Sequence, residues 1–191
     1  MKTKFNVYQM TITALLCAIG IIIPLFSPLK IILEPASFTL ASHVPIFIAM
    51  FISPVTAVIV ALGTTMGFFF GGFPLVVVLR AATHLVFSFC GALVLKKKVH
   101  ILEFTGQAFI FSFLIGVLHA IGEMLVVMPF YFGNSMSQAY YAKGFIVSIV
   151  LLVGVGTIIH SMVDFAISMV VWRPLRKVIK VPGVKKRPSH L

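Results

Sequence analysis

The sequence contains very few acidic residues and little charge of either sign. Only 4 of its 191 residues are Asp or Glu, 10% are charged, and 60% are hydrophobic. The mean hydropathy is +1.14. A soluble globular domain could not bury so many apolar side chains. The shortage of charge therefore excludes a soluble domain and predicts an integral membrane protein.

Motifs for catalysis and for cysteine chemistry are also missing. The two cysteines, Cys17 and Cys90, lie in apolar segments without CxxC spacing, so each is read most simply as a packing residue. The chain has no HExxH or GxSxG motif and no phosphate-binding loop. We therefore expect a protein that is not an enzyme, does not hydrolyse ATP itself and has no cofactor.

Apolar runs separated by proline, glycine or charge predict an all-α fold with one six-helix membrane domain over residues 1–191. The second run is short, at roughly 11 residues against the ~20 of a full span, and predicts a partial or tilted helix. The first outer loop, residues 27–42, has no strong span signal and is expected to form an ordered lid over an outward cavity. The predicted helices are 7–26, 43–53, 54–71, 74–95, 104–131 and 144–172.

Positive charge is concentrated on one side of this predicted bundle. Lysines precede the first helix, three more follow the fourth at 96–98, and a basic tail covers about 173–191. The other side has only Lys30 and Lys143. By the positive-inside rule both termini are expected in the cytoplasm, in a multi-pass protein of the cell membrane. Attraction to anionic headgroups is the simplest role for the tail.

Three polar pairs interrupt the later apolar helices at a spacing of four residues, which places both members on one helix face. Charged groups in hydrocarbon are costly, so the pairs should converge between helices or line a watery cavity. Counted from the helix ends, two pairs form an outward layer and the third lies deeper, which suggests a different role. The pairs are Arg80 with His84, His119 with Glu123, and His160 with Asp164.

These residues allow several interpretations. Arg80 and Glu123 could form a purely structural ion pair. His84, His119 and Glu123 could bind a metal ion, although Arg80 beside His84 would repel it. A small polar solute is the third possibility, with Arg80 binding its anionic group. The deeper pair is most simply a link between helices, and proton relay in an ion-coupled permease is the alternative.

The first helix contains Ala14 and Ala18 in an AxxxA arrangement, which allows another helix to approach closely. With six helices, a long first outer loop and polar residues in the later helices, nearly the whole chain resembles the substrate-binding S components of energy-coupling factor (ECF) vitamin transporters. The run SHVPIFIAMFISPVTAVIVALGTTMGFFFGGFPLVVVLRAATHLVFSFCGALV, residues 42–94, is most similar to the pantothenate-type members.

The resemblance implies a vitamin-binding subunit of an ABC-type transport complex. Ala14 and Ala18 would match the docking surface for a transmembrane T component, and two cytoplasmic ATPases would complete the transporter. The resemblance assigns no role to His160 and Asp164. The residues that match the vitamin site are Arg80, His84, His119, Glu123 and Asn134.

Pantothenate is the substrate we predict, with Arg80 holding its carboxylate. Nicotinate shares that carboxylate. Pyridoxine or a hydroxymethylpyrimidine would use Glu123 and leave Arg80 as its ion-pair partner. Two alternatives belong to another functional class. One is a metal-uptake protein that uses His84, His119 and Glu123, and the other is an ion-coupled permease driven through His160 and Asp164.

Overall fold

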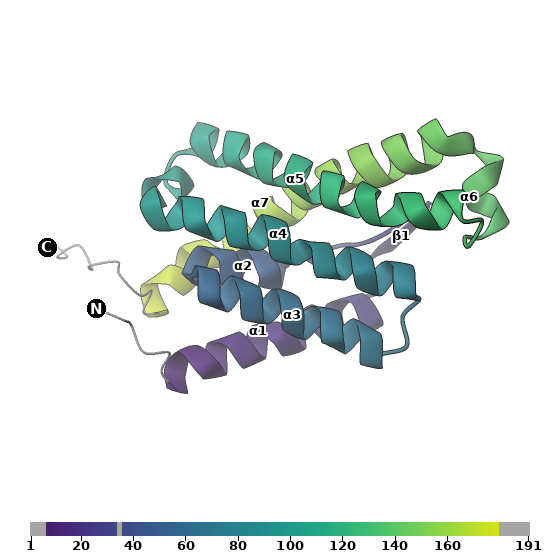
Figure 1. Cartoon of the computed structure of the whole chain (residues 1–191). Helices are drawn as coiled ribbons and strands as arrows, with labels where there is room; N and C mark the ends of the chain where they lie inside the picture. The colour runs from purple at the N-terminus through teal and green to yellow at the C-terminus, as the bar shows by residue number, and fades with distance from the viewer. Residues whose placement is uncertain (1–6, 34–35, 180–191) are drawn as a thin grey trace, which may run out of the picture.

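A computed structural model of the chain describes residues 7–33 and 36–179. In order, it contains α1 (Val7–Phe26), β1 (Lys30–Leu33), β2 (Ala36–Thr39), α2 (Val44–Ile52), α3 (Pro54–Phe70), α4 (Leu75–Lys97), α5 (Thr105–Phe132), α6 (Gln138–Ala142) and α7 (Gly156–Val178). A short 3-10 turn, Val99–Leu102, precedes α5, and a π-helix, Ile146–Val155, leads directly into α7. The long helices lie roughly side by side in one bundle (Figure 1).

The short helix α2 lies in the centre of the bundle. All nine of its residues are buried, and it packs against α1, α3, α4 and α7. A helix that is apolar all round belongs in a core. The chain then turns directly into α3, because Ser53 caps that helix by accepting the Thr56 N–H at 3.1 Å and Pro54 begins it. The prediction of a short second helix followed by a tight break is confirmed.

Helices α1 and α3 approach closely through small residues on α3. A Cβ atom on Gly63 would lie 2.7 Å from the Cys17 Sγ, and one on Gly67 would lie 2.3 Å from the Ile21 Cδ1. Close approach through small residues four apart is typical of helix packing in membranes. Ala14 and Ala18 are exposed, so the AxxxA pattern of α1 is not used inside the bundle.

The first outer loop forms a β-hairpin, which is a small addition to a fold that is otherwise helical, as predicted. Strands β1 and β2 pair antiparallel, with Lys30 opposite Thr39. Beyond the pair, the Leu40 N–H donates to the Leu29 carbonyl at 2.9 Å. Each run has four residues, too few for a stable helix, and hairpin pairing satisfies backbone groups that would otherwise lack partners. The turn at 34–35, including Glu34, lies outside the described residues.

Two predicted boundaries near the end of the chain also change. The loop expected at 132–143 contains the short helix α6, and the last helical segment continues to Val178. Arg173, Arg176 and Lys177, which we assigned to the tail, therefore lie in the last turns of α7. The rest of the tail, from 180 onward, and the lysines before α1 lie outside the described residues.

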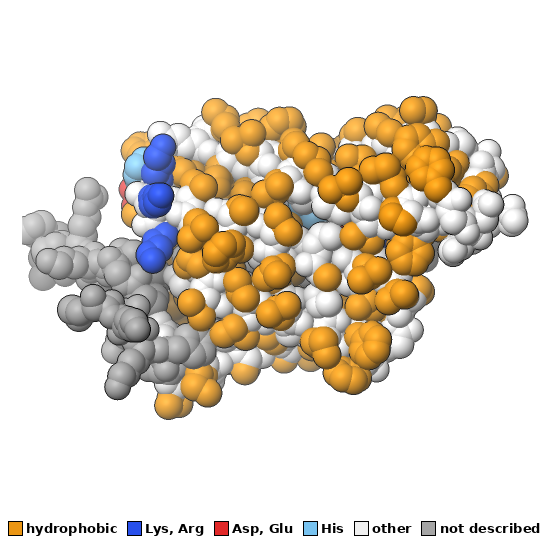
Figure 2. Space-filling model, viewed as in Figure 1, with side chains coloured by type: hydrophobic (Ala, Val, Ile, Leu, Met, Phe, Trp, Pro, Cys, Tyr) orange, Lys and Arg blue, Asp and Glu red, His pale blue; other side chains and the backbone are white. Residues whose placement is uncertain are grey.

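The surface has the distribution of a membrane protein. Large apolar side chains are exposed along α1, α3, α4, α5 and α7, and Lys and Arg side chains gather at one end (Figure 2). We call this the lysine end, defined by Lys96–Lys98, Arg173 and Arg176, and the opposite end, which carries β1 and β2, the hairpin end. Among the described residues, four helical segments are long and apolar enough to cross a membrane, and α3, at 17 residues, is slightly shorter. The count of six spans and the cytoplasmic termini stay predictions.

Candidate functional site

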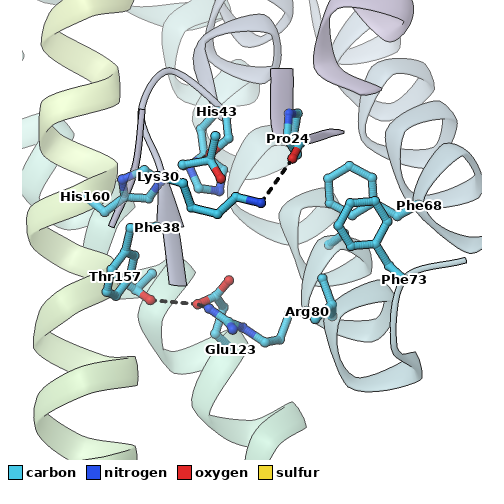
Figure 3. A pocket seen from close by; sticks show the side chains of 14 residues that line it. Pro24, Lys30, Phe38, His43, Phe68, Phe73, Arg80, Glu123, Thr157 and His160 are labelled. Atoms are coloured by element: carbon cyan, nitrogen blue, oxygen red, sulfur yellow. Dashed lines mark hydrogen bonds and ion pairs between the residues drawn. The ribbon is translucent and has the colours of Figure 1, made fainter. Parts of the chain in front are cut away.

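A pocket of about 100 Å³ opens at the hairpin end, between the β-hairpin and helices α3, α4, α5 and α7. Its wall is part polar and part aromatic (Figure 3). The polar side chains come from segments far apart in the sequence. They are Lys30, Thr39, Ser42, His43, Arg80, Glu123, Thr157 and His160.

Glu123 of α5 is the centre of one polar network. Its Oε2 accepts a hydrogen bond from the Arg80 Nη2 at 2.8 Å and another from the Thr157 Oγ1 at 2.6 Å. Its Oε1 lies 3.4 Å from the His119 Nε2 and 3.9 Å from the His84 Nε2. The spacing rule predicted that these pairs converge, and the structure places Arg80, His84, His119 and Glu123 together.

Asp164 of α7 is the centre of a second network, which holds the segment between β2 and α2. Its Oδ1 accepts the Ala41 N–H at 2.7 Å, and its Oδ2 accepts the His43 N–H at 2.9 Å. The His43 Nδ1 lies 3.1 Å from Oδ2, and the His160 Nε2 lies 3.5 Å from it. Ala41 has a φ of +66°, which is costly for a residue with a Cβ atom. Asp164 therefore fixes a strained point at the end of the lid.

His43 joins the two networks. Its ring centroid lies 4.7 Å from that of His84, 4.8 Å from His119 and 4.9 Å from His160. The pair at His160 and Asp164 is therefore not separate from the other two pairs, as we had expected it to be. The π-helix before α7 packs more residues into each turn, so its rise per residue is smaller than the 1.5 Å that our depth estimate assumed.

Sequence reasoning did not identify His43 as a site residue. It stands directly before the nine-residue apolar helix α2 and is 7% exposed. A histidine at the N-terminus of a completely buried helix needs polar partners. Its position before an apolar run was therefore the feature of the sequence that could have identified His43 as a site residue. Lys30 was noted only for its charge, and its Nζ also lines the pocket, 3.4 Å from the Pro24 carbonyl.

The aromatic part of the wall comes from the hairpin, from the end of α3 and from the turn that follows it. Phe68 and Phe73 stack with ring centroids 4.7 Å apart. Phe38 of β2 lies 5.3 Å from the His160 ring, and a Cβ atom on Gly156 would come within 2.7 Å of it. The close contact with Gly156 brings the hairpin against α7. Flat apolar faces beside charged groups suit a ring that carries a charge.

Asn134 is not part of this pocket, although the sequence analysis included it. It follows α5, is exposed, and adopts a φ of +51° in the turn after that helix. Ala14 and Ala18 lie outside the pocket too, on the exposed face of α1. His84 and His119 do not line the pocket either and lie in the buried layer behind it.

Several buried polar atoms have no hydrogen-bond partner among the described residues. They are the Arg80 Nε, the His84 Nε2, both ring nitrogens of His119 and the Ser161 Oγ. Buried polar groups are nearly always paired, so unpaired ones at a site indicate an absent ligand or ordered water. The arrangement can thus hold a small anion in the pocket, and its imidazoles can hold a cation behind it.

The chain is similar to a protein of known role. It is 40% identical over 178 residues to the niacin transporter NiaX of Lactococcus lactis subsp. cremoris (strain MG1363), and the aligned part covers 93% of this chain and 79% of that protein. No protein-family profile matches the chain, and no solved structure matches it significantly. Identity at this level over this length establishes common ancestry. The chain therefore belongs to the ECF S-component family of membrane transport proteins, which its sequence resembles.

Proposed function

We propose that this protein is the nicotinate-binding S component of an ECF transporter, and that the pocket at the hairpin end is its substrate site. The observation that carries the proposal is the extended similarity to NiaX, a niacin transporter, combined with a small pocket that has cationic and aromatic walls. Pantothenate, our first prediction, has no support from this relative. Nicotinate, our stated alternative, fits both observations.

The size of the pocket favours a compact ligand. Its volume of about 100 Å³ is well below the ~300–1,000 Å³ typical of drug-sized ligands. Nicotinate is a single pyridine ring with one carboxylate, whereas pantothenate is a flexible chain with an amide and hydroxyls. Phe38, Phe68 and Phe73 offer the ring apolar faces to pack against.

Two cationic side chains are available for the carboxylate. Among the described residues, the Lys30 Nζ hydrogen-bonds to the Pro24 carbonyl at 3.4 Å, which is a long bond, so it can move toward a ligand. Arg80 uses Nη2 on Glu123, yet its Nε is buried and has no partner among the described residues. We propose that Lys30 and Arg80 share the carboxylate, and that Glu123 orients the guanidinium. His84 and His119 support Glu123 from behind, and Asn134 has no part.

The lid and its anchor complete the site. The hairpin contributes Lys30, Phe38 and Thr39, and Asp164 holds its end through backbone N–H groups. An acid used in this way is poorly suited to carry protons. This is our reason to favour a subunit coupled to ATPases over the permease driven through His160 and Asp164. In this proposal two cytoplasmic ATPases and a transmembrane T component are the partners, and the lysine end faces the cytoplasm.

Equilibrium binding of radiolabelled nicotinate to the purified protein tests the proposed substrate. We expect displacement by unlabelled nicotinate and no displacement by pantothenate. Nicotinamide, which has the same ring and a neutral carboxamide, should compete much more weakly because it loses the charge-assisted contacts. Displacement by pantothenate, or equal competition by nicotinamide, would contradict the carboxylate assignment.

Assembly tests the proposed docking surface on α1. Both Ala14 and Ala18 are exposed, so a larger side chain there does not disturb the bundle. Ala14→Trp and Ala18→Trp should block assembly with the T component and leave nicotinate binding unchanged. Leu125→Trp, at a 61% exposed position on α5, is the matched control and should assemble normally. Full transport by the α1 variants would show that Ala14 and Ala18 do not form the docking surface.

A further inference from the structure

Behind the substrate pocket lies a cluster of imidazoles that the proposed nicotinate site does not use fully. His43, His84 and His119 come from three different elements: the start of α2, α4 and α5. One ring nitrogen from each lies within 4.8 Å of one from each of the others, and all three residues are buried. We propose that these three histidines bind a divalent transition-metal ion, with zinc as the ion that best matches the donor set.

Unpaired nitrogens are the first support for this site. The His84 Nε2 and both ring nitrogens of His119 are buried without a hydrogen-bond partner among the described residues. The His119 Nε2 lies 3.4 Å from the Glu123 Oε1, but not in hydrogen-bond geometry. Leaving polar atoms unpaired in a membrane interior is costly, and a metal ion would satisfy two of these imidazoles at once.

The surroundings of His43 are the second support. Its Nδ1 lies 3.1 Å from the Asp164 Oδ2, which leaves Nε2 for a metal ion. A carboxylate that accepts a proton from one ring nitrogen fixes the tautomer and strengthens the other nitrogen as a ligand, a pattern common to metal-binding histidines. Asp164 itself is held by two backbone N–H groups, so it is a fixed orienting group.

Charge is the third support, and it removes an objection raised from the sequence. The objection was that Arg80, one helical turn from His84, would repel a cation. The Arg80 guanidinium is paired with the Glu123 carboxylate at 2.8 Å, so its charge is neutralised. Glu123 and Asp164 together carry two negative charges against the one positive charge of Arg80. With neutral imidazoles, and with the exposed Lys30 at the pocket rim left aside, this buried group of residues therefore has a net charge of one negative unit, which favours a divalent cation.

The proposed metal site adjoins the pocket and shares His43 with it. His43 lines the pocket, but His84 and His119 do not. On the other side, Phe87 lies against both rings, at 5.6 Å from His84 and 4.5 Å from His119. The ion would thus lie between the pocket floor and an aromatic layer. Zinc–nitrogen bonds of ~2.0–2.1 Å require the three nitrogens to draw together from their present spacing, which rotation of the imidazoles allows.

Metal content of the full-length protein, purified without a polyhistidine tag and without nicotinate, tests this inference. We expect about one zinc ion per chain by elemental analysis. After removal of the zinc, added Co²⁺ should give the intense visible absorption of a four-coordinate site with three imidazoles and a water molecule as ligands. If the wild-type protein takes up neither ion in a stoichiometric amount, the proposal is wrong.

Substitutions then locate the ion. His84→Phe and His119→Phe keep a ring in place and should lose the Co²⁺ band, while His100→Phe, at an exposed histidine of the lysine end, should keep it. Asp164→Asn should weaken Co²⁺ binding by about 10- to 100-fold, as for other orienting groups. A band that survives in both buried variants but disappears in His160→Phe would move the ion to His43, His160 and Asp164 and overturn our ligand set.

Nicotinate binding measured on the same samples separates this inference from the proposed function. Metal-free protein that binds nicotinate and takes up no Co²⁺ would contradict the metal site alone. Protein that binds Co²⁺ through these histidines and never binds nicotinate would contradict the proposed substrate alone.

Discussion

The two buried carboxylates of the site, Glu123 and Asp164, are used in different ways. Glu123 accepts its hydrogen bonds from the side chains of Arg80 and Thr157. Asp164 accepts two of its bonds from the backbone N–H groups of Ala41 and His43. Side chains can change rotamer when a ligand arrives, whereas a backbone N–H moves only with the chain. Glu123 is therefore suited to a wall that responds to substrate, and Asp164 to a fixed anchor.

The difference explains why both residues stand four positions from a histidine without having the same role. His119 lies behind Glu123, where it can support a rearrangement of the Arg80 ion pair. His160 lies beside Asp164 and also contacts the lid through the Ser42 Oγ at 3.2 Å. The same spacing on a helix thus gives a ligand wall at Glu123 and a fixed anchor at Asp164. Four predictions test this contrast.

Breaking the Arg80–Glu123 pair should have the largest effect. Arg80→Ala leaves a buried carboxylate without its cation and should cost about 3–5 kcal/mol of stability, and it should also remove most nicotinate binding. Unfolding in mixed detergent micelles and ligand binding measure the two effects.

A double variant is the control for the ion pair. Arg80→Ala combined with Glu123→Ala removes both charges, so its loss of stability should be clearly smaller than the sum of the two single losses. Additive losses would show that the two groups act independently and that Glu123 does not orient the guanidinium.

Asp164→Ala should have the next largest effect on stability. It leaves the Ala41 and His43 N–H groups without their acceptor, at a cost of about 1–3 kcal/mol for the buried His43 group and less for the half-buried Ala41 group. The unfolding measurement should show a loss of about 2–5 kcal/mol. Asp164→Asn, which keeps one acceptor oxygen, should fall between the wild type and Asp164→Ala. Equal stability of all three proteins would show that Asp164 is not an anchor.

Much of the helical framework could be predicted from sequence because hydrophobic runs broken by Pro and Gly carry strong information. The first helix was placed at 7–26 and is found there, and Ser53-Pro54 marked the start of α3. The hairpin was not predicted, since its strands have only four residues each and depend on their partner and on α7. Local patterns do not report such tertiary support.

The site was predicted in part for a similar reason. Spacing of four residues identified Arg80, His84, His119 and Glu123, because both members of each pair belong to one helix. His43 and Lys30 precede or lie outside the helices, so no periodic pattern marked them. The π-helix before His160 was not predicted, because a π-helix cannot be recognised from hydrophobic periodicity.

Lys30→Ala should have a moderate effect on binding and almost none on stability. The side chain is exposed at the pocket rim, so its contact with a carboxylate is partly screened, and we expect about tenfold weaker nicotinate binding. Lys97→Ala, at an exposed lysine of the lysine end, is the matched control and should bind normally. If both variants bind as tightly as the wild type, Arg80 alone holds the carboxylate.

The smallest effect concerns two serines on α7, seven residues apart and hence on one face. The Ser168 Oγ donates to the Asp164 carbonyl at 2.6 Å, while the Ser161 Oγ is buried without a partner among the described residues. Ser168→Ala should lose about 0.5–1.5 kcal/mol of unfolding free energy, whereas Ser161→Ala should lose nothing or gain up to ~1 kcal/mol. If Ser161→Ala instead destabilises the protein as much as Ser168→Ala does, the Ser161 hydroxyl has a partner, and α7 binds water or ligand beside the Asp164 anchor.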